Sequence, residues 1–453
     1  MATKVDATSG NLVKKIFIYA IPLILTSILQ EFFNIADKAV LGNMAGSIAV
    51  AAIGTTGVVT SLITNGAIGI STGTIIILAR YVGQRDDVKI RKTINTSLLT
   101  AVFLGLIIAI AGFFLAPVFL RATDCPDECL KEAVIYTRIY LASAPIILLY
   151  NYGSALLRTL GDTQRPLFFI IIAGGINVIL NVILCIIMTQ KVAAVAIATL
   201  VSQAVSALLV LRQLTKLDDN VKLQVFKMRF HPDIFIQLLR YGIPSSISNL
   251  MVPLGNLQIV PAINSFGVDA IAGNSAVASL QSISGAFISG FSATATTFIG
   301  QNLGANDHDR VKKSFWYILL FSALISGAIG VSMYLSGRFW IGIIIGPSAT
   351  AAIEYGMRRM FFVNLFTFIA AINNLLSHAL QAFGYPLFTS ISNIAFTLGF
   401  RIIWMQFVYP LKPAFDTIML CFLVSWLLNM LLYTVFFSFV YTRYTRKGIY
   451  KKI

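Results

Sequence analysis

The chain has 453 residues, of which 57% are hydrophobic and only 11% are charged. Water-soluble domains carry roughly 25% charged residues, so this composition excludes an ordinary soluble protein and predicts one embedded in lipid. The formal net charge of +16 does not indicate nucleic-acid binding, because the basic residues form short clusters between apolar runs. That distribution is typical of the loops between membrane spans. We therefore expect the lipid bilayer as a partner, and no nucleic acid.

Apolar runs close to the ~20 residues that a helix needs to cross a bilayer recur along the whole chain. The first run follows a short polar N-terminus without a cleavage site, so we interpret it as a retained helix. The pattern predicts an all-α integral membrane protein of about twelve transmembrane helices, arranged in two pseudo-symmetric six-helix bundles with a central cavity. The predicted spans are residues 15–40, 52–79, 94–120, 134–157, 166–188, 192–213, 236–264, 271–300, 315–345, 356–383, 387–409 and 416–441.

The distribution of basic residues predicts the orientation. Most of the 34 Lys and Arg residues fall on segments that share a side with the N-terminus. Basic loops stay in the cytoplasm, so we expect both termini there and a location in the cell (inner or plasma) membrane. Arg358 and Arg359 belong to the few basic residues on the outer segments, and Lys38 and Arg401 fall within or beside predicted spans.

The chain also repeats a set of motifs in one order. Tyr19-Ala-Ile-Pro22 corresponds to Tyr241-Gly-Ile-Pro244, and later motifs ending in Gly161 and Gly384 correspond in the same way. Six spans per half return the chain to the same side, so the repeats share an orientation and enclose a cavity. We predict an N-lobe over residues 1–214, a cytoplasmic linker over 215–233 and a C-lobe over 234–453.

Several motifs together resemble one transporter family over nearly the whole chain. They are Ile21-Pro22, Leu29-Gln30 with Asn34, Asp37 and Gly42, Ala79-Arg-Tyr-Val-Gly-Gln84, Arg158-Thr-Leu-Gly-Asp-Thr163, Asn177 with Asn181, and Gly300-Gln301-Asn302-Leu-Gly304-Ala305. In their order and spacing the chain resembles a bacterial member of the multidrug and toxic compound extrusion (MATE) family. The resemblance implies an antiporter, not an enzyme, that exports organic, often cationic, compounds by alternating access. It implies Na⁺ or H⁺ as the coupling ion, no other cofactor, and we expect a monomer.

Polar groups in the first predicted span indicate a functional site, because such groups are costly in a membrane. Gln30, Asn34 and Asp37 follow i, i+4, i+7 spacing and share one helical face. Asp37 matches the family's first-helix aspartate, which the resemblance assigns to cation or proton coupling. A carboxylate binds Na⁺ directly or takes up a proton when it is desolvated. The alternative is a carboxylate near the helix end that Lys38 neutralises.

Glu31 and Lys38 are unusual residues for this span. The resemblance leads us to expect an uncharged residue in place of Lys38, which either holds Asp37 ionised or extends to the interface. Glu31 stands where we expect glutamine, and it either carries protons or pairs with Lys38. Both alternatives stay open for each residue.

The fifth predicted span places Asn177 and Asn181 one helical turn apart. In many relatives the second position is an aspartate, so Asn181 removes a second carboxylate from the coupling site. An asparagine ligates Na⁺ through its carbonyl but cannot carry a proton. We predict a coupling site of Asp37, Asn34, Asn177 and Asn181, with Asp37 and Asn181 as possible Na⁺ ligands; for Asn177 an interhelical hydrogen bond is the alternative.

The second half offers few acidic residues but several polar candidates for the substrate cavity or for coupling. They are Gln258 in a span broken by prolines, Asn374 and His378 in the tenth span, and Arg401 in the eleventh. His378 could titrate near neutral pH, although a lone histidine is more often a structural hydrogen-bonding group. Arg401 requires anions or carbonyl groups as neighbours. Gln30, Glu31 and Lys38 complete this group of candidates.

Two other functions are alternatives to export. A lipid-linked precursor or polysaccharide flippase of related architecture would favour a strongly basic cavity, for which the sequence offers only Lys38 and Arg401. A membrane-embedded enzyme would require clustered histidines or acids, and the 3 histidines are widely separated. Cys125 and Cys129 lie in a polar loop, where they either form a local bridge or remain free.

Overall fold

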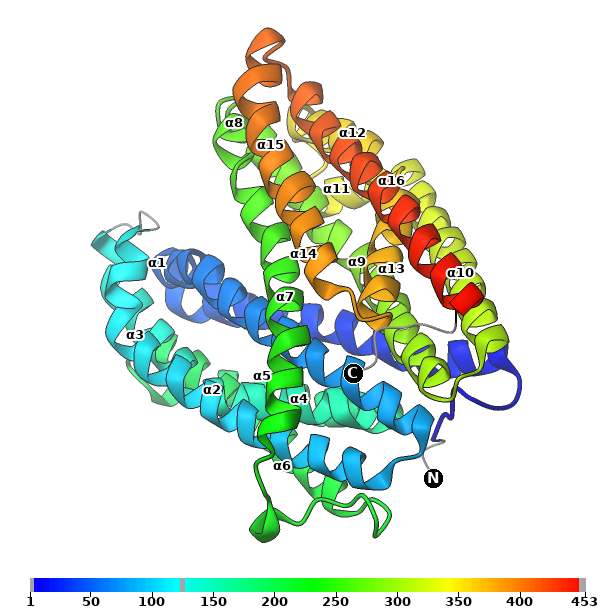
Figure 1. Cartoon of the computed structure of the whole chain (residues 1–453). Coiled ribbons are helices and arrows are strands. Elements are labelled where there is room, and N and C mark those ends of the chain that lie inside the picture. The colour runs from blue at the N-terminus through cyan, green and yellow to red at the C-terminus, as the bar shows by residue number, and fades with distance from the viewer. Residues whose placement is uncertain (1–3, 123–126, 448–453) are drawn as a thin grey trace. The chain divides into compact units, whose positions relative to one another are not determined.

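The computed structural model describes residues 4–122 and 127–447 and is dominated by long helices (Figure 1). The side chains of residues 38, 39, 41, 43, 45–55, 58, 59, 122, 446 and 447 lie outside that description. The chain divides into two compact units. Unit 1 comprises the segment up to Asp6 together with Leu25–Ser246, and unit 2 comprises Ala7–Ile24 together with the chain from Ile247 onward.

Unit 1 is formed by helices from the first half of the chain. They are the later part of α1 (Leu12–Gln84), α2 (Asp87–Ala122), α3 (Asp127–Ala142), α4 (Ala144–Thr159), α5 (Gln164–Ile187), α6 (Lys191–Thr215), η1 (Val225–Lys227) and the beginning of α7 (Pro232–Leu257). The bounds of α1 contain two stretches that are long and apolar enough to cross a membrane, Leu12–Asp37 and Thr60–Gln84. These correspond to the first two predicted spans.

Unit 2 contains the beginning of α1, the end of α7 and the helices that follow it. These are α8 (Val260–Asn264), α9 (Val268–Gly304), α10 (His308–Leu335), α11 (Gly337–Ile345), α12 (Thr350–Val363), α13 (Thr367–Ala382), α14 (Pro386–Asn393), η2 (Ile394–Gly399), α15 (Phe400–Ile403), η3 (Trp404–Val408), η4 (Tyr409–Leu411) and α16 (Phe415–Lys447).

The helices confirm the predicted all-α membrane architecture. Within the described residues, 9 helices are long and apolar enough to cross a membrane, or up to 11 if each bent pair is one span. The predicted span at 236–264 corresponds to α7 and α8 and is not among them. Its prolines and its serine and asparagine side chains make it less apolar than its neighbours, so composition alone does not identify it as a span.

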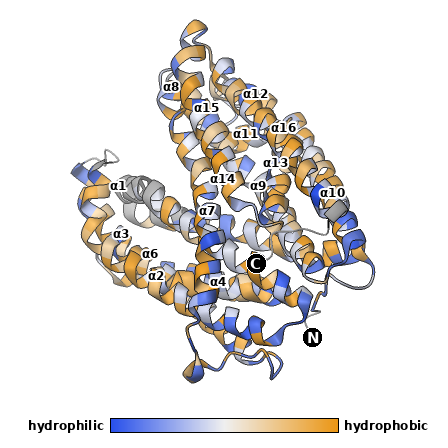
Figure 2. Ribbon diagram, viewed as in Figure 1, coloured by the Kyte–Doolittle hydropathy of each residue, from blue (hydrophilic) through white to orange (hydrophobic). Residues whose placement is uncertain are grey.

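The outer surface of α2 shows how the helices suit lipid. Phe103, Ile110, Phe114 and Val118 are 58%, 62%, 71% and 61% exposed. Their spacing places them on one helical face, and Figure 2 shows hydrophobic residues predominating along this helix. Such a continuous apolar face is unfavourable in water but matches the hydrocarbon core of a bilayer.

The sequence repeat reappears as matched local geometry in the two units. The pair α3 and α4 is bent by 47°, and the pair α12 and α13 by 46°. Gly161 and Gly384, which follow these bent pairs, both have φ of 93°. Arg85 and Asn306 follow α1 and α9 with φ of 55° and 58°, in the left-handed region that few non-glycine residues adopt. The equivalent backbone irregularities support a duplicated architecture.

Equivalent aspartates begin the next helix in each unit. The backbone N–H of Lys89 donates to Asp86 Oδ1 at 3.0 Å before α2, and the N–H of Arg310 donates to Asp307 Oδ1 at 2.9 Å before α10. These caps satisfy backbone donors that the first helical turn leaves unpaired. The N–H of Lys89 also lowers the pKa of Asp86 below its usual value, because it stabilises the ionised carboxylate.

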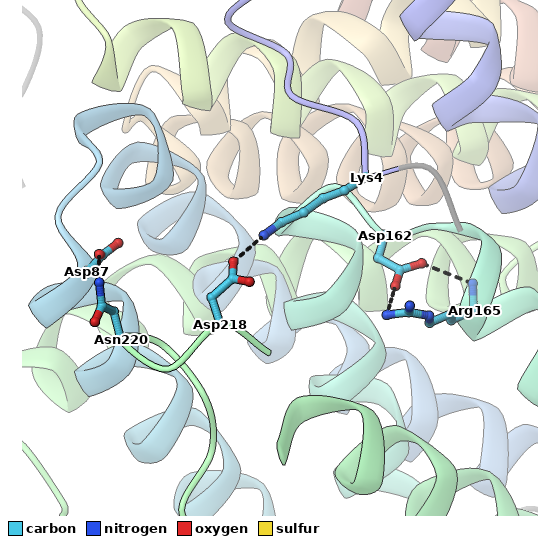
Figure 3. Close-up of polar contacts among 6 residues, drawn as sticks. All are labelled: Lys4, Asp87, Asp162, Arg165, Asp218 and Asn220. Carbon is cyan, nitrogen blue, oxygen red and sulfur yellow. Dashed lines mark hydrogen bonds and ion pairs between the residues drawn. The ribbon is translucent and has the colours of Figure 1, made fainter. Parts of the chain in front are cut away.

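Polar contacts anchor the predicted linker to unit 1 (Figure 3). Lys4 Nζ lies 3.2 Å from Asp218 Oδ2, and Asn220 Nδ2 donates to Asp87 Oδ2 at 3.1 Å. The same view shows Arg165 paired with Asp162 at 3.1 Å, at the beginning of α5. The segment that follows α6 is therefore tied to unit 1 by side chains as well as by the chain itself.

The start of α7 packs closely on α1 within unit 1. Ser246 Oγ donates to the backbone O of Gly66 at 2.7 Å, and a side chain at Gly69 would overlap the backbone of Ser246. Small residues allow such close approach of helices in lipid. The chain therefore passes from unit 1 to unit 2 inside α7, at Ser246 and Ile247, whereas the lobe boundaries predicted at 214 and 234 follow the sequence repeat and stay a prediction.

Candidate functional site

Unit 1 contains a polar cavity of about 420 Å³. Its walls come from two parts of α1, one up to Asp37 and one from Thr60 onward, and from α3, α4, α5 and α6. Its lining residues are Gln30, Glu31, Phe33, Asn34, Asp37, Thr60, Ser61, Thr64, Asn65, Ile68, Tyr136, Tyr140, Ile147, Tyr150, Asn151, Ile170, Ala173, Gly174, Asn177, Thr199, Ser202, Gln203 and Ser206.

The predicted polar face of α1 lines this cavity. Gln30, Asn34 and Asp37 all contribute to its wall, as their helical spacing requires, and Glu31 contributes as well. The side chain of Lys38 lies outside the described part of the structure. Its pairing with Glu31 or with Asp37 therefore stays a prediction.

Asp37 and the two asparagines of α5 form a short hydrogen-bond chain. Asn181 Nδ2 donates to Asp37 Oδ1 at 2.5 Å and to Asn177 Oδ1 at 3.1 Å. The remaining polar atom of that side chain, Asn181 Oδ1, is buried and has no hydrogen-bond partner within the described structure. An unpaired buried carbonyl is costly, so this atom is available to a ligand.

The unit-1 cavity is negatively charged by the side chains that the structure describes. Glu31 and Asp37 are acidic, and none of the other described lining residues is basic. Hydroxyl groups line the same cavity, including a Thr64–Tyr140 hydroxyl pair at 3.1 Å. A cavity of one sign concentrates counter-ions of the other.

The oxygen donors fit a hard cation. In the described part of the chain, no group of three or more His, Cys, Asp and Glu side chains could hold a metal ion. Hard cations accept carboxylate, amide carbonyl and hydroxyl oxygens instead. Asp37 and the unpartnered Asn181 Oδ1 supply the first two of these ligand types, which makes both residues suitable for Na⁺.

Unit 2 contains a second cavity, of about 310 Å³. Prolines and a run of π-helical turns shape its surrounding helices. Its lining residues are Ser248, Asn249, Val252, Asn256, Gln281, Ser284, Gly285, Ile288, Ser289, Arg359, Thr367, Ala370, Asn373, Asn374, Ser377, His378, Gln381, Asn393, Thr397, Arg401, Phe422, Trp426 and Tyr433.

Three of the four candidates from the second half line this cavity. Asn374, His378 and Arg401 belong to its wall, and His378 Nδ1 lies 2.9 Å from Thr296 Oγ1. Gln258 is exposed and lines neither cavity, because α7 ends at Leu257 and the chain turns there. Asn256, two residues earlier, takes the position in the wall that we predicted for Gln258.

Arg401 occupies an irregular part of its helix. It lies in the four-residue helix α15, between the π-helical turns η2 and η3. π-helical turns often mark functional positions in membrane and soluble proteins. Its guanidinium group donates to Asn256 Oδ1 at 2.8 Å and lies 4.6 Å from the centre of the Phe422 ring.

Arg359 is a cavity residue that the sequence analysis placed on an outer segment. It is only 8% exposed, and its guanidinium group donates to Gln281 Oε1 at 2.9 Å and also to Asn274 Oδ1. Its neighbour Arg358 is half-exposed and pairs with Asp416 at 4.0 Å. Both arginines lie near the start of the predicted span 356–383, so their sequence positions do not show which of the two is buried.

A family model named MatE matches residues 22–183 and 244–405, which is more than half of the chain. The chain belongs to the MATE family. It is accordingly a multi-pass membrane transporter and not an enzyme. The two matched segments also correspond to the internal repeat, one in each half of the sequence.

Similar MATE and related proteins extend over most of the chain. It is 26% identical over 391 residues to the probable multidrug resistance protein YpnP of Bacillus subtilis, covering 86% of each protein. It is 27% identical over 309 residues to an FAD transporter of Shewanella oneidensis, covering 65% of this chain and 66% of that protein. A solved outward-facing multidrug resistance MATE transporter of the MOP superfamily shares the fold with a TM-score of 0.86, 21% identity, and coverage of 99% and 100% of the two chains.

Proposed function

We propose that this MATE protein exports small organic compounds, many of them cationic, in exchange for Na⁺ or H⁺ that binds at Asp37. The observation that carries the proposal is the position of this carboxylate in a cavity where the described lining residues include no basic side chain. Asp37 faces the unit-1 cavity, receives a hydrogen bond from Asn181, and is joined by no basic side chain among the described lining residues. A carboxylate in that setting needs a cation or a proton to balance its charge.

The coupling step follows from that balance. An empty, ionised site favours whichever state exposes Asp37 to water, and an occupied site removes that preference. Because a ligand shifts a conformational equilibrium only through its different affinities for the two states, ion entry and substrate release are linked when each favours a different state. We propose alternating access on this basis, in a monomer with both termini in the cytoplasm of a cell whose plasma membrane holds it.

The neighbouring asparagines have different roles in the proposed ion site. Asn181 offers the unpartnered Oδ1 as a second ligand, and Asn177 fixes its orientation by accepting its other N–H. Asn34 lines the same cavity. None of these three asparagines can carry a proton, so Asp37 and Glu31 are the groups able to serve proton coupling among the described lining residues.

The test is efflux of ethidium from proteoliposomes that hold the purified protein. Separate Na⁺ and H⁺ gradients are imposed on the wild-type protein, Asp37→Asn and Glu31→Gln. Asp87→Asn provides a matched control, because Asp87 is a carboxylate of unit 1 that contacts Asn220 and lines neither cavity. We expect one gradient to drive efflux, Asp37→Asn to abolish that drive, and Asp87→Asn to retain it.

Two outcomes would contradict the proposal. Gradient-driven efflux that survives Asp37→Asn but not Glu31→Gln would move the coupling role to Glu31. Wild-type protein that responds to neither gradient would remove cation coupling altogether.

A flippase is the second candidate, for a specific reason. The sequence offered only Lys38 and Arg401 for a basic cavity, whereas the structure adds Arg359 to the wall of the unit-2 cavity. The Shewanella relative is named an FAD transporter, and FAD contains a diphosphate group. Movement of a fluorescent phospholipid between the leaflets of the same proteoliposomes tests the flippase directly.

A further inference from the structure

Arg359 and Arg401 place two guanidinium groups beside one aromatic ring of the unit-2 cavity. The guanidinium carbon of Arg401 lies 4.6 Å from the centre of the Phe422 ring, and that of Arg359 lies 6.0 Å from it. The two arginines come from α15 and α12, and they are 2% and 8% exposed. Both side chains line the same cavity.

The partners of both groups are neutral among the described residues. Arg401 donates to Asn256 Oδ1, whereas Arg359 donates to Asn274 and Gln281. Each arginine keeps a buried Nε without a hydrogen-bond partner in the described structure. A guanidinium group offers five N–H donors in a planar fork, so each arginine retains donor capacity.

Other arginines of this unit are paired differently. Arg338 contacts Glu354 at 3.0 Å and Arg358 contacts Asp416 at 4.0 Å, both at exposed positions. Within the described residues, Arg359 and Arg401 make no such ion pair, and the lining of their cavity includes no carboxylate. The two arginines that line this cavity are therefore buried without an anionic partner among the described residues.

Burying a charge without a counter-charge is costly, and the cost is greatest inside a membrane protein. Amide oxygens and an aromatic face recover part of it. An oxyanion would recover more, because the guanidinium fork matches the geometry of carboxylate and phosphate groups and forms charge-assisted hydrogen bonds with them. The two arginines thus lack a counter-charge that a bound carboxylate or phosphate group would supply.

We propose that the unit-2 cavity binds the carboxylate or phosphate group of an organic anion, held by Arg359 and Arg401. Most of the cavity wall is polar, but Ile288, Ala370 and Trp426 also line it and are available to the carbon skeleton of the ligand. This inference rests on the proposed transport function for its cargo, and it adds anionic or zwitterionic compounds to the substrates. The acidic unit-1 cavity and the basic unit-2 cavity then take ligands of opposite charge.

The experiment measures binding to the purified full chain in a neutral detergent. The probe is 1-naphthyl phosphate, compared with the neutral 1-naphthol and the cationic 1-naphthylmethylamine. Isothermal titration gives the affinity, and thermal unfolding gives the stabilisation that binding produces. The variants are Arg359→Gln, Arg401→Gln and Arg401→Lys, and Arg358→Gln is the matched control at an exposed arginine next in sequence to Arg359.

We expect the wild-type protein to bind the phosphate in preference to both comparison compounds. Arg359→Gln and Arg401→Gln should each weaken that binding by about tenfold or more, because each removes charge-assisted hydrogen bonds. Arg401→Lys should bind with intermediate affinity, since it keeps the charge but loses the fork, and Arg358→Gln should match the wild type. The wild-type preference among the three naphthyl compounds tests the proposal even if a variant does not fold.

A second arm distinguishes a soluble anion from a lipid headgroup. Dioctanoyl phosphatidic acid replaces the naphthyl compound, with dioctanoylglycerol as its neutral comparison. Binding of the phosphatidic acid alone, dependent on Arg401, supports the anion site and assigns it to a lipid. Failure of the wild type to prefer either anion, or equal loss in Arg358→Gln and Arg401→Gln, overturns the proposal.

The outcome is separable from that of the coupling experiment. Asp37→Asn leaves unit 2 unchanged, so it should retain the binding of 1-naphthyl phosphate while it loses cation-driven efflux. If the wild-type protein does not prefer the anionic probes but its efflux still depends on Asp37, this inference is refuted and the proposed coupling stays intact.

Discussion

Asn181 of α5 donates a hydrogen bond of 2.5 Å to Oδ1 of Asp37 on α1. The pair joins two helices through residues that lie 144 positions apart in sequence. It also leaves Asn181 Oδ1 buried without a partner in the described structure. The carboxylate is thus positioned by a neutral donor, and the same donor offers an oxygen for an ion.

Replacing that donor tests how the site holds its ion. Asn181→Asp would place two carboxylates within hydrogen-bonding distance, where one of them must take up a proton or share a cation. We expect tighter Na⁺ binding or steeper pH dependence of efflux in Asn181→Asp, and weaker ion binding in Asn181→Leu. Isothermal titration with NaCl and efflux measured between pH 6 and 8 check both variants. Identical ion affinity in the two variants would exclude Asn181 from the site.

A glycine of α5 packs closely against Phe33 in the wall of the unit-1 cavity. A methyl group at Gly174 would overlap the ring of Phe33, which also lines the cavity, whereas one at Gly175 meets nothing within 4 Å. We expect Gly174→Ala to lower the free energy of unfolding by about 1–3 kcal/mol, as overpacking does. Gly175→Ala should be neutral or stabilise by up to about 1 kcal/mol, since alanine favours helix. Thermal unfolding in detergent compares them, and equal effects would contradict the packing.

The ring of Phe422 contacts both arginines that line the unit-2 cavity. Phe422→Leu removes a cation–π contact that we expect to contribute about 0.5–2 kcal/mol to stability, and it should weaken the binding of 1-naphthyl phosphate. Phe437→Leu is the control: Phe437 lies on the same helix, α16, and stacks on Phe315 at 4.3 Å. It should lower the melting temperature without changing anion affinity. Equal loss of affinity in both variants would separate Phe422 from the site.

Arg310 clamps the N-terminal segment within unit 2. Its Nε donates to the backbone O of Ala7 at 2.7 Å, and its Nη2 donates to the carbonyls of Ser9 and Gly10. We expect Arg310→Ala to speed hydrogen exchange of the amides near Ala7, because the contacts that order this segment are lost. Lys313→Ala is the charge-matched control. Unchanged exchange in Arg310→Ala would show that other contacts hold the segment, such as the hydrogen bond of 3.1 Å from Ala7 N–H to Gln301 Oε1 and that of 3.3 Å from Asn302 Nδ2 to Ala7 O.

Part of this architecture was predictable from the sequence because it depends on local patterns. The spans follow from the length of apolar runs, and the shared face of Gln30, Asn34 and Asp37 follows from helical periodicity. The repeat was visible in motifs, and the structure shows it again in the similar backbone at Gly161 and Gly384. These features are set by residues close to one another in the chain.

Tertiary structure decided the features that depend on distant neighbours. Arg358 and Arg359 are adjacent and chemically identical, yet one faces an aspartate at an exposed position and the other is buried against α9. Asn256 and Gln258 are also close in sequence but differ in their surroundings. Helix α7 ends at Leu257, and of these two residues Asn256 is the one that contacts Arg401. Composition and periodicity identify which residues are polar inside the membrane. The charge that each polar group meets comes from helices far away in sequence, and only packing brings those helices together.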